Sequence, residues 1–296
     1  MEVVETLKSA GIIPVIVIED EAQAVPLANA LVNGGLPVLE VTFRTKAAAG
    51  AIAKIKAEVP NAVVGAGTLL TKEQVKAAKD AGAVFGVAPG FDPAIVAYAQ
   101  EIGLPMVPGI ATASELSQAL TAGVPMVKFF PAEAAGGVKM IKNLLGAFRF
   151  TGVKFMPTGG VNPQNVKEYL AVPEIVACGG TWIVPKDALA ANDWAAIEKL
   201  AAEAMNSISL IPGKSAPVTM AEIIPDCNLY YGSIDGAPCA IVDVACNNTP
   251  DSAALKEYSV NICKALNEIA GIDLQRIYIK HHGIPEWHAS NSLFAE

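Results

Sequence analysis

The sequence predicts an α/β protein: a (β/α)8 barrel of the TIM type over residues 1–206, followed by a small C-terminal α+β domain. The first observation is an alternation of short apolar runs and alanine-rich segments with helical spacing. The second is the composition, with 52% hydrophobic and 17% charged residues, which suits parallel strands buried on both faces. The third is the length of 296 residues, which exceeds the ~250 typical of one barrel and leaves room for an appended unit.

The predicted strands and helices follow one another through the barrel segment. The strands are 13–18, 38–42, 62–67, 84–89, 105–109, 126–131, 153–158 and 174–180. The helices are 20–33, 46–57, 71–81, 92–102, 113–122, 137–147, 162–171 and a long one near 187–206. Thr71 with Gln74, and Asp92 with Pro93, are typical pairs at helix starts. The alternative is an open doubly wound sheet, which the lack of a GxGxxG turn after the first strand disfavours.

The last ninety or so residues are expected to form a separate unit. Residues 207–217 contain Ser, Gly and Pro and read as a linker. The domain over 218–296 then has a strand at 238–246, a helix at about 250–271 and a second strand at 276–282. This order predicts a compact βαβ-like unit.

Composition excludes several classes of protein. The net charge of −8 argues against a nucleic-acid-binding surface. No apolar run reaches 18 residues, and the first residues lack the basic start and apolar core of a signal peptide, so no membrane association and a cytoplasmic location are expected. The five cysteines are scattered without CxxC spacing, which favours reduced, packed thiols over a zinc or redox site.

A lysine in the apolar stretch MVKFFPAE, residues 126–133, is the most unusual feature of the barrel segment. On a buried strand, a charged amine loses most of its hydration. Burial favours the neutral amine, which is the form that attacks a ketone to give a Schiff base. Strand alternation lets Glu40 and Lys128 point into the same barrel mouth. Alternatively, Lys128 reaches the rim with its long side chain, or Glu40 is only a structural ion-pair partner.

Polar and glycine residues gather at the C-terminal ends of the predicted strands, where the active sites of such barrels lie. They are Glu40, Thr42 and Arg44, then Thr68, then Pro89 and Gly90, then Lys128 and Phe130, then Thr158, Gly159 and Gly160, and finally Gly179, Gly180 and Thr181. The guanidinium of Arg44 suits a carboxylate next to the ketone, and the two Gly-Gly pairs leave backbone N–H groups open to a phosphate. Taken singly, Thr68 could be a helix cap and each Gly-Gly pair a plain turn.

Seven motifs occur in the order LEVTFRT, VGAGT, APG, VPGIAT, VKFFPAEAAGGVK, PTGGVN and CGGTW. Over about residues 5–205 they closely resemble the 2-keto-3-deoxy-6-phosphogluconate (KDPG) aldolases, which also act on 4-hydroxy-2-oxoglutarate (KHG). The resemblance implies that Lys128 forms the Schiff base, that Glu40 is the general acid/base and that Arg44 binds the pyruvate carboxylate. Thr68 and Pro89 would line the pyruvate pocket.

The resemblance also implies roles around the far end of the substrate. Phe130 would pack beside the lysine, and Thr158 would lie near the substrate. The phosphate loops would contain Gly159, Gly160, Gly179 and Gly180. Thr181 stands where a serine is usual, which keeps the hydroxyl but narrows the phosphate pocket. No metal or other cofactor is implied, since the imine takes the role that a Lewis-acid ion has in other aldolases.

The C-terminal part, about residues 236–295, resembles half of a domain of the macrophage migration inhibitory factor group of tautomerases. The similarity lies in PCAIVDV, YSVNICKALNEIAGI and LQRIYIKHH. Tautomerases use an N-terminal proline as a base, whereas Pro217 lies in mid-chain, and Lys280 stands where an asparagine is expected. We therefore expect no tautomerase activity and a role in assembly. Histidines 281, 282 and 288 are expected at an interface or a solvated end, in preference to a metal site.

Two functions are compatible with these patterns. The first is a class I aldolase that cleaves KDPG to pyruvate and glyceraldehyde 3-phosphate, or KHG to pyruvate and glyoxylate. The second is a catalytically impaired barrel with a structural or regulatory role in an oligomer. Both resembled families form trimers, so a homotrimer is expected, with a hexamer if the C-terminal domains of two trimers pair. Retention of Glu40, Arg44, Thr68 and Lys128 favours the enzyme.

Overall fold

The computed structural model describes residues 2–208, 240–247, 263, 267, 272 and 277–284. The chain divides into two compact units, Met1–Ala216 and Pro217–Glu296.

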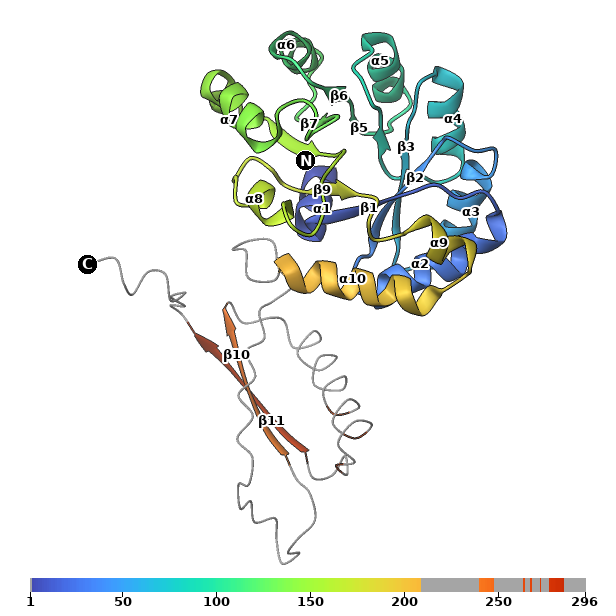
Figure 1. Cartoon of the computed structure of the whole chain (residues 1–296), viewed down its shortest axis with the longest axis vertical. Helices are drawn as coiled ribbons and strands as arrows, with labels where there is room; N and C mark the ends of the chain where they lie inside the picture. Colours follow the sequence, from blue (N-terminus) through green and yellow to red (C-terminus); the bar gives the residue numbers. More distant parts are fainter. Residues whose placement is uncertain are drawn as a thin grey trace, which may run out of the picture. The chain divides into compact units, whose positions relative to one another are not determined.

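The first unit is an α/β fold built on a curled parallel sheet with helices around it (Figure 1). Its strands are β1 (Ile12–Ile16), β2 (Val38–Thr42), β3 (Val63–Gly67), β4 (Gly86–Val87), β5 (Met106–Val107), β6 (Gly109–Ile110), β7 (Met126–Phe129), β8 (Lys154–Pro157) and β9 (Cys178–Gly180). They pair in the orders β5-β4-β3-β2-β1-β9 and β6-β7-β8, and every pair is parallel. Because β1 to β5 add one after another in chain order, without the reversal of a doubly wound sheet, that alternative is wrong.

The segment predicted as one strand at 105–109 is split in two at Pro108. A proline has no N–H to donate to a ladder, and here the chain changes partners: β5 pairs with β4, whereas β6 pairs with β7. Two further parallel bridges, Phe155 to Ile175 and Thr158 to Gly179, join the β8 segment to the β9 segment. These bridges continue the sheet from β8 toward β9.

The helices follow the strands as the apolar spacing predicts. They are α2 (Ala24–Asn33), α3 (Ala48–Glu58), α4 (Lys72–Asp80), α5 (Pro93–Glu101), α6 (Ala113–Thr121), α7 (Gly137–Phe148), α8 (Val166–Leu170), α9 (Lys186–Ala190) and α10 (Trp194–Ile208), with short 3-10 turns η1 (Glu21–Gln23) and η2 (Arg149–Thr151). The expected caps form: the Thr71 side chain accepts from the Gln74 N–H, and Asp92 accepts from two N–H groups of α5.

The predicted helix at 187–206 is instead two helices. Asn192, between α9 and α10, has φ 54°, a left-handed conformation that ends a helix. The helix α10 extends to Ile208, two residues into the predicted linker, and the rest of that linker, 209–217, lies outside the described residues. None of the helices in the described part of the chain has the length and apolar character needed to cross a bilayer.

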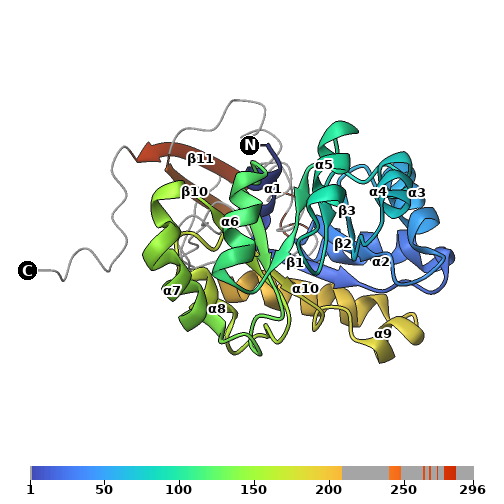
Figure 2. The ribbon, with the colours of Figure 1, turned by 90° about the horizontal axis from the view of Figure 1, so that it is seen from above.

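The first helix, α1 (Glu2–Ala10), was not predicted from the sequence, yet it completes the core. Leu7 and Ala10 of α1 belong to an interior cluster of apolar side chains that the strands direct inward. The strands contribute Ile13, Val38, Val87, Val107, Met126 and Met156, and the residues directly before β4 and β9 contribute Phe85, Val176 and Ala177. A second, larger cluster lies between the strands and the surrounding helices. Figure 2 shows α1 at one end of the strands, so the interior is closed there by apolar side chains.

In the second unit, β10 (Ala240–Asn247) and β11 (Ile277–Ile284) pair in parallel, with Ala240 opposite Ile277. The two strands match the predicted strands with bounds shifted by one or two residues. The predicted helix between them falls largely outside the described residues. The resemblance of this part to half a tautomerase domain therefore stays a prediction.

Replacing Leu7 by alanine should destabilise the first unit. Leu7 is 0% exposed, so truncation leaves a cavity in the interior cluster, and we expect the free energy of unfolding to fall by about 2–5 kcal/mol. Chemical denaturation followed by circular dichroism measures the change. The matched control is Leu70→Ala, since Leu70 is 54% exposed and its loss should change the free energy far less. Equal effects of the two substitutions would contradict the role given to α1.

Candidate active site

Two buried ionisable side chains meet inside the curl of the sheet. Lys128 on β7 is 5% exposed and Glu40 on β2 is 0% exposed. The distance from Lys128 Nζ to Glu40 Oε1 is 3.7 Å. The strands β2 and β7 are not paired with each other, so the contact spans the interior of the sheet. Neither carboxylate oxygen of Glu40 has a hydrogen-bond partner among the described residues.

Strand alternation places this pair directly above an apolar floor. Val38 precedes Glu40 by two residues and Met126 precedes Lys128 by two, and both Val38 and Met126 belong to the interior cluster. Residues two apart on a strand share a face, so Glu40 and Lys128 form the next layer toward the C-terminal ends of the strands. The apolar layer keeps water away from the inner side of the pair, and access is left from the C-terminal ends.

A glycine on the neighbouring strand makes room for the Glu40 carboxylate. Gly67 ends β3, and a Cβ atom built on it would lie 2.0 Å from Glu40 Oε1. No side chain fits there unless the carboxylate moves. Gly67 therefore fixes where the acid can stand relative to Lys128.

Two buried threonines near the C-terminal ends of the strands, Thr42 and Thr158, differ in their hydrogen bonding. The Thr42 hydroxyl donates to the Ile16 carbonyl at 2.8 Å, which fastens β2 to β1. The Thr158 hydroxyl is buried without a hydrogen-bond partner in the described chain. A Cβ atom on Gly179 would lie 2.3 Å from the Thr158 hydroxyl oxygen. Like the Glu40 carboxylate, the Thr158 hydroxyl is free to receive a polar ligand group.

Aromatic and backbone groups enclose Lys128 from two sides. Its Nζ atom lies 5.3 Å from the centre of the Phe130 ring, and that ring would be 3.2 Å from a Cβ atom on Gly159. Gly109 is the register partner of Lys128 on β6, and a Cβ atom there would lie 2.1 Å from the Pro89 carbonyl oxygen. Phe130, Gly159 and Pro89 are thus brought to the neighbourhood of the lysine.

Thr68 stands beside the pair in an unusual conformation. It directly follows Gly67 and has φ 60°, in the left-handed region that β-branched residues rarely adopt. Such a conformation persists only where the surrounding structure imposes it, and it occurs preferentially at functional sites.

The other predicted site residues lie at the C-terminal ends of β2, β8 and β9. Arg44 and Thr181 are exposed, and within residues 2–208 no hydrogen bond or ion pair holds the Arg44 guanidinium. Gly160 is exposed with φ 84°. Gly180 is buried, and a Cβ atom on it would collide with the Trp182 ring at 1.8 Å. Arg44 and Thr181 are therefore at the expected rim, where a ligand can reach them.

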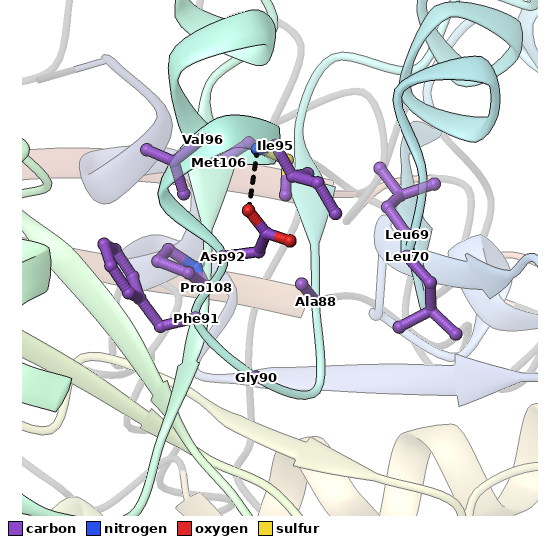
Figure 3. A pocket seen from close by; sticks show the side chains of 10 residues that line it. All are labelled: Leu69, Leu70, Ala88, Gly90, Phe91, Asp92, Ile95, Val96, Met106 and Pro108. Carbon is purple, nitrogen blue, oxygen red and sulfur yellow. Dashed lines mark hydrogen bonds between the residues drawn. The ribbon is translucent and has the colours of Figure 1, made fainter.

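A small pocket next to this region does not contain the lysine (Figure 3). It has a volume of about 190 Å³ and is lined by Leu69, Leu70, Ala88, Gly90, Phe91, Asp92, Ile95, Val96, Met106 and Pro108. The Asp92 carboxylate beside it is already used as the cap of α5. Leu69 and Gly90 directly follow Thr68 and Pro89, but neither Lys128 nor Glu40 lines the pocket, so it is not where the pair would react.

This arrangement is suited to covalent chemistry on a carbonyl compound. Lys128 supplies an amine shielded from water, which attacks a ketone once it is neutral. The Glu40 carboxylate, with both oxygens unpartnered, can take up and return protons at that amine. A structural ion pair would instead have its carboxylate satisfied by further hydrogen bonds.

Comparison with known proteins agrees with this chemistry. The family model for KDPG and KHG aldolase matches residues 3–200. The chain belongs to this aldolase family. The 2-dehydro-3-deoxy-phosphogluconate aldolase of Treponema pallidum is 45% identical over 207 residues, 70% of this chain and 98% of the relative. The KHG/KDPG aldolase of Escherichia coli K12 is 46% identical over 204 residues, 69% of this chain and 95% of the relative.

Solved aldolase structures resemble the first unit of the chain. The Legionella pneumophila KDPG aldolase, with pyruvate captured as a covalent carbinolamine intermediate, has 41% identity and a TM-score of 0.65. The match covers 67% of this chain and 96% of the Legionella chain. The Zymomonas mobilis ZM4 enzyme, solved with 3-phosphoglycerate, has 43% identity and a TM-score of 0.65 over 69% of this chain and 95% of that one. The family match ends at residue 200, before the second unit of the chain.

Two glycines of the aldolase site were not singled out from the sequence. Gly67 and Gly109 matter because they lack a side chain. The absence of a Cβ atom at Gly67 leaves space for Glu40, and its absence at Gly109 lets the chain at Pro89 approach β6. Which neighbours meet these glycines depends on strand register. The glycine in the GAGT motif was visible, but a glycine before a threonine is equally compatible with a turn.

Replacing Gly67 by alanine should lower aldolase turnover with little loss of fold. The added methyl forces the Glu40 carboxylate away from Lys128, and a displacement of about 1 Å at a catalytic group commonly costs ~100-fold in rate. Steady-state turnover with circular dichroism measures both effects. The matched control is Gly146→Ala on α7, where a Cβ atom would meet no atom within 4 Å. If Gly67→Ala turned over substrate at the wild-type rate, the Glu40 carboxylate would not need its observed position for catalysis.

Proposed function

We propose that this protein is a class I aldolase that cleaves a 2-keto-4-hydroxy acid to pyruvate and an aldehyde through a Schiff base on Lys128. The observation that carries the proposal is the Lys128 amine, 5% exposed, 3.7 Å from a fully buried carboxylate whose oxygens are otherwise unpartnered. The covalent carbinolamine with pyruvate in the Legionella relative supports the same chemistry.

The reaction follows from what the two groups can exchange. The neutral Lys128 amine adds to the ketone carbon, and loss of water from the carbinolamine gives a protonated imine. Glu40, within reach of Nζ, transfers the protons needed for that loss. It then removes the proton of the 4-hydroxyl group while the C3–C4 bond breaks. The bonding electrons pass to the imine as an enamine, the aldehyde leaves, and protonation and hydrolysis release pyruvate and the free lysine.

The residues around the pair supply substrate contacts in this proposal. Arg44 binds the carboxylate next to the ketone, because a guanidinium offers two parallel charge-assisted bonds. Thr68, Pro89 and Phe130 enclose the pyruvate part of the substrate. The Thr158 hydroxyl forms a hydrogen bond with the substrate, as donor or acceptor. These assignments are supported by the position of each residue at a strand end near Lys128 or beside Glu40.

The far end of the substrate lies in this proposal at the turns after β8 and β9. Gly159, Gly160, Gly179, Gly180 and Thr181 form the phosphate site. Relatives named KHG/KDPG aldolase, and the Zymomonas structure with 3-phosphoglycerate, support both KDPG and KHG as candidate substrates. KDPG would give glyceraldehyde 3-phosphate, and KHG would give glyoxylate, each with pyruvate.

We infer in addition that the sheet closes as a (β/α)8 barrel, which the two bridges between the β8 and β9 segments support. The protein is proposed to act as a cytoplasmic homotrimer, with residues 218–296 as an assembly domain that permits a hexamer. Light scattering of the chain with and without residues 207–296 tests this role. If the number of chains per assembly is the same with and without these residues, the assembly role is refuted.

Pyruvate with borohydride should leave a stable adduct on Lys128. Borohydride reduces the imine to a secondary amine, so the adduct survives digestion and peptide mass mapping locates it. The control is Lys128→Met, which should show no adduct. An exposed lysine such as Lys76, already paired with Asp80, should stay unmodified. A wild-type protein without an adduct on Lys128 would favour the structural or regulatory alternative.

A further inference from the structure

A tyrosine and a glutamate outside the reacting pair are joined next to the proposed phosphate site. The Tyr169 hydroxyl, on α8, donates a hydrogen bond to the Glu133 carboxylate in the loop after β7. Tyr169 is 0% exposed, whereas Glu133 lies at the surface. Burial first, and then the hydrogen bond to Glu133, raise the pKa of the Tyr169 phenol above its ordinary value. The phenol therefore stays a donor at neutral pH.

Glu133 touches both glycines of the turn after β8. Its backbone N–H donates to the Gly159 carbonyl at 3.0 Å. A Cβ atom on Gly160 would lie 2.5 Å from Glu133 Cγ, so the side chain of Glu133 lies directly against the Gly160 backbone. Because Tyr169 holds the end of this side chain, the tyrosine fixes the part of Glu133 that covers Gly160.

The Gly160 peptide is also held from its other side. Its carbonyl oxygen accepts hydrogen bonds from the side-chain amides of Asn162 and Asn165, each at 3.1 Å. Since the C=O and the following N–H of a peptide point in opposite directions, this contact orients the next N–H, of Val161, away from the two asparagines. Gly159 and Gly160 have φ 96° and 84°, which glycine adopts without strain but side chains with a Cβ rarely do, so these contacts select one arrangement of a turn that other residues could not form.

We propose that the Glu133–Tyr169 pair is a positioning device for the Gly159–Gly160 turn, and that it sets the affinity for the phosphate end of the substrate. The inference rests on the proposed function. Among the described residues neither is a hydrogen-bond or ion-pair partner of Lys128, so the pair is assigned to binding at the turn and not to cleavage of the carbon–carbon bond.

The test compares a phosphorylated and an unphosphorylated substrate in Tyr169→Phe. Steady-state kinetics with KDPG should show KM raised by about fivefold or more, the effect of one lost hydrogen bond to a charged group. The KM for KHG and both kcat values should stay within about twofold, because a change in KM alone reports lost ground-state binding. Tyr98→Phe, which removes a phenol hydroxyl from α5, is the control and should change neither KM.

Variants of Glu133, the exposed member of the pair, test the same interaction with Tyr169. Glu133→Gln keeps an oxygen that accepts from Tyr169 and should behave as wild type, whereas Glu133→Ala should reproduce the selective rise in KM for KDPG. Equal changes for both substrates, no change for KDPG, or a wild type that binds KDPG no better than KHG would each overturn the proposal. Pyruvate trapping on Lys128 should be unchanged in all variants, and its loss in the wild type would instead refute the proposed function.

Discussion

The burial of Lys128 beside Glu40 is the constraint on which the rest of the first unit depends. Taking two charges out of water costs several kcal/mol per ion, and their mutual contact at 3.7 Å offsets only part of this cost, because the Glu40 oxygens have no further partners among the described residues. The curl of the sheet makes the contact possible, because it brings β2 and β7 to face each other across the interior. The apolar layer of Val38 and Met126, closed below by α1, then limits access to the C-terminal side.

Features that weaken stability are concentrated around the pair. The Glu40 oxygens and the Thr158 hydroxyl are buried without partners, and Thr68 has a left-handed backbone conformation. Each is unfavourable for folding, by about 1–3 kcal/mol for a buried unsatisfied group or a strained residue. The Glu40 carboxylate and the Thr158 hydroxyl also stay ready for a ligand. This pattern is expected where reactivity is kept at the expense of stability.

Much of the fold and of the reacting pair could be predicted from the sequence, because both depend on local patterns. The spacing of apolar residues predicts the strands, and Lys128 stands out because it is a lysine within an apolar strand. The missed features depend on tertiary contacts. The helix α1 is short and was recognisable only by what Leu7 packs against, and the split at Pro108 follows from a change of strand partner. The role of Gly67 requires the register between β2 and β3, which no sequence pattern states.

In the proposed mechanism the Glu40–Lys128 pair serves reaction and not stability, and a double variant separates these two roles. In Glu40→Leu combined with Lys128→Met, the two charges are replaced by apolar side chains of similar size. Turnover should be lost, while the free energy of unfolding should stay equal to that of the wild type or rise by up to about 4 kcal/mol, as for other buried ion pairs. A double variant that is clearly less stable than the wild type would show instead that the pair is structural.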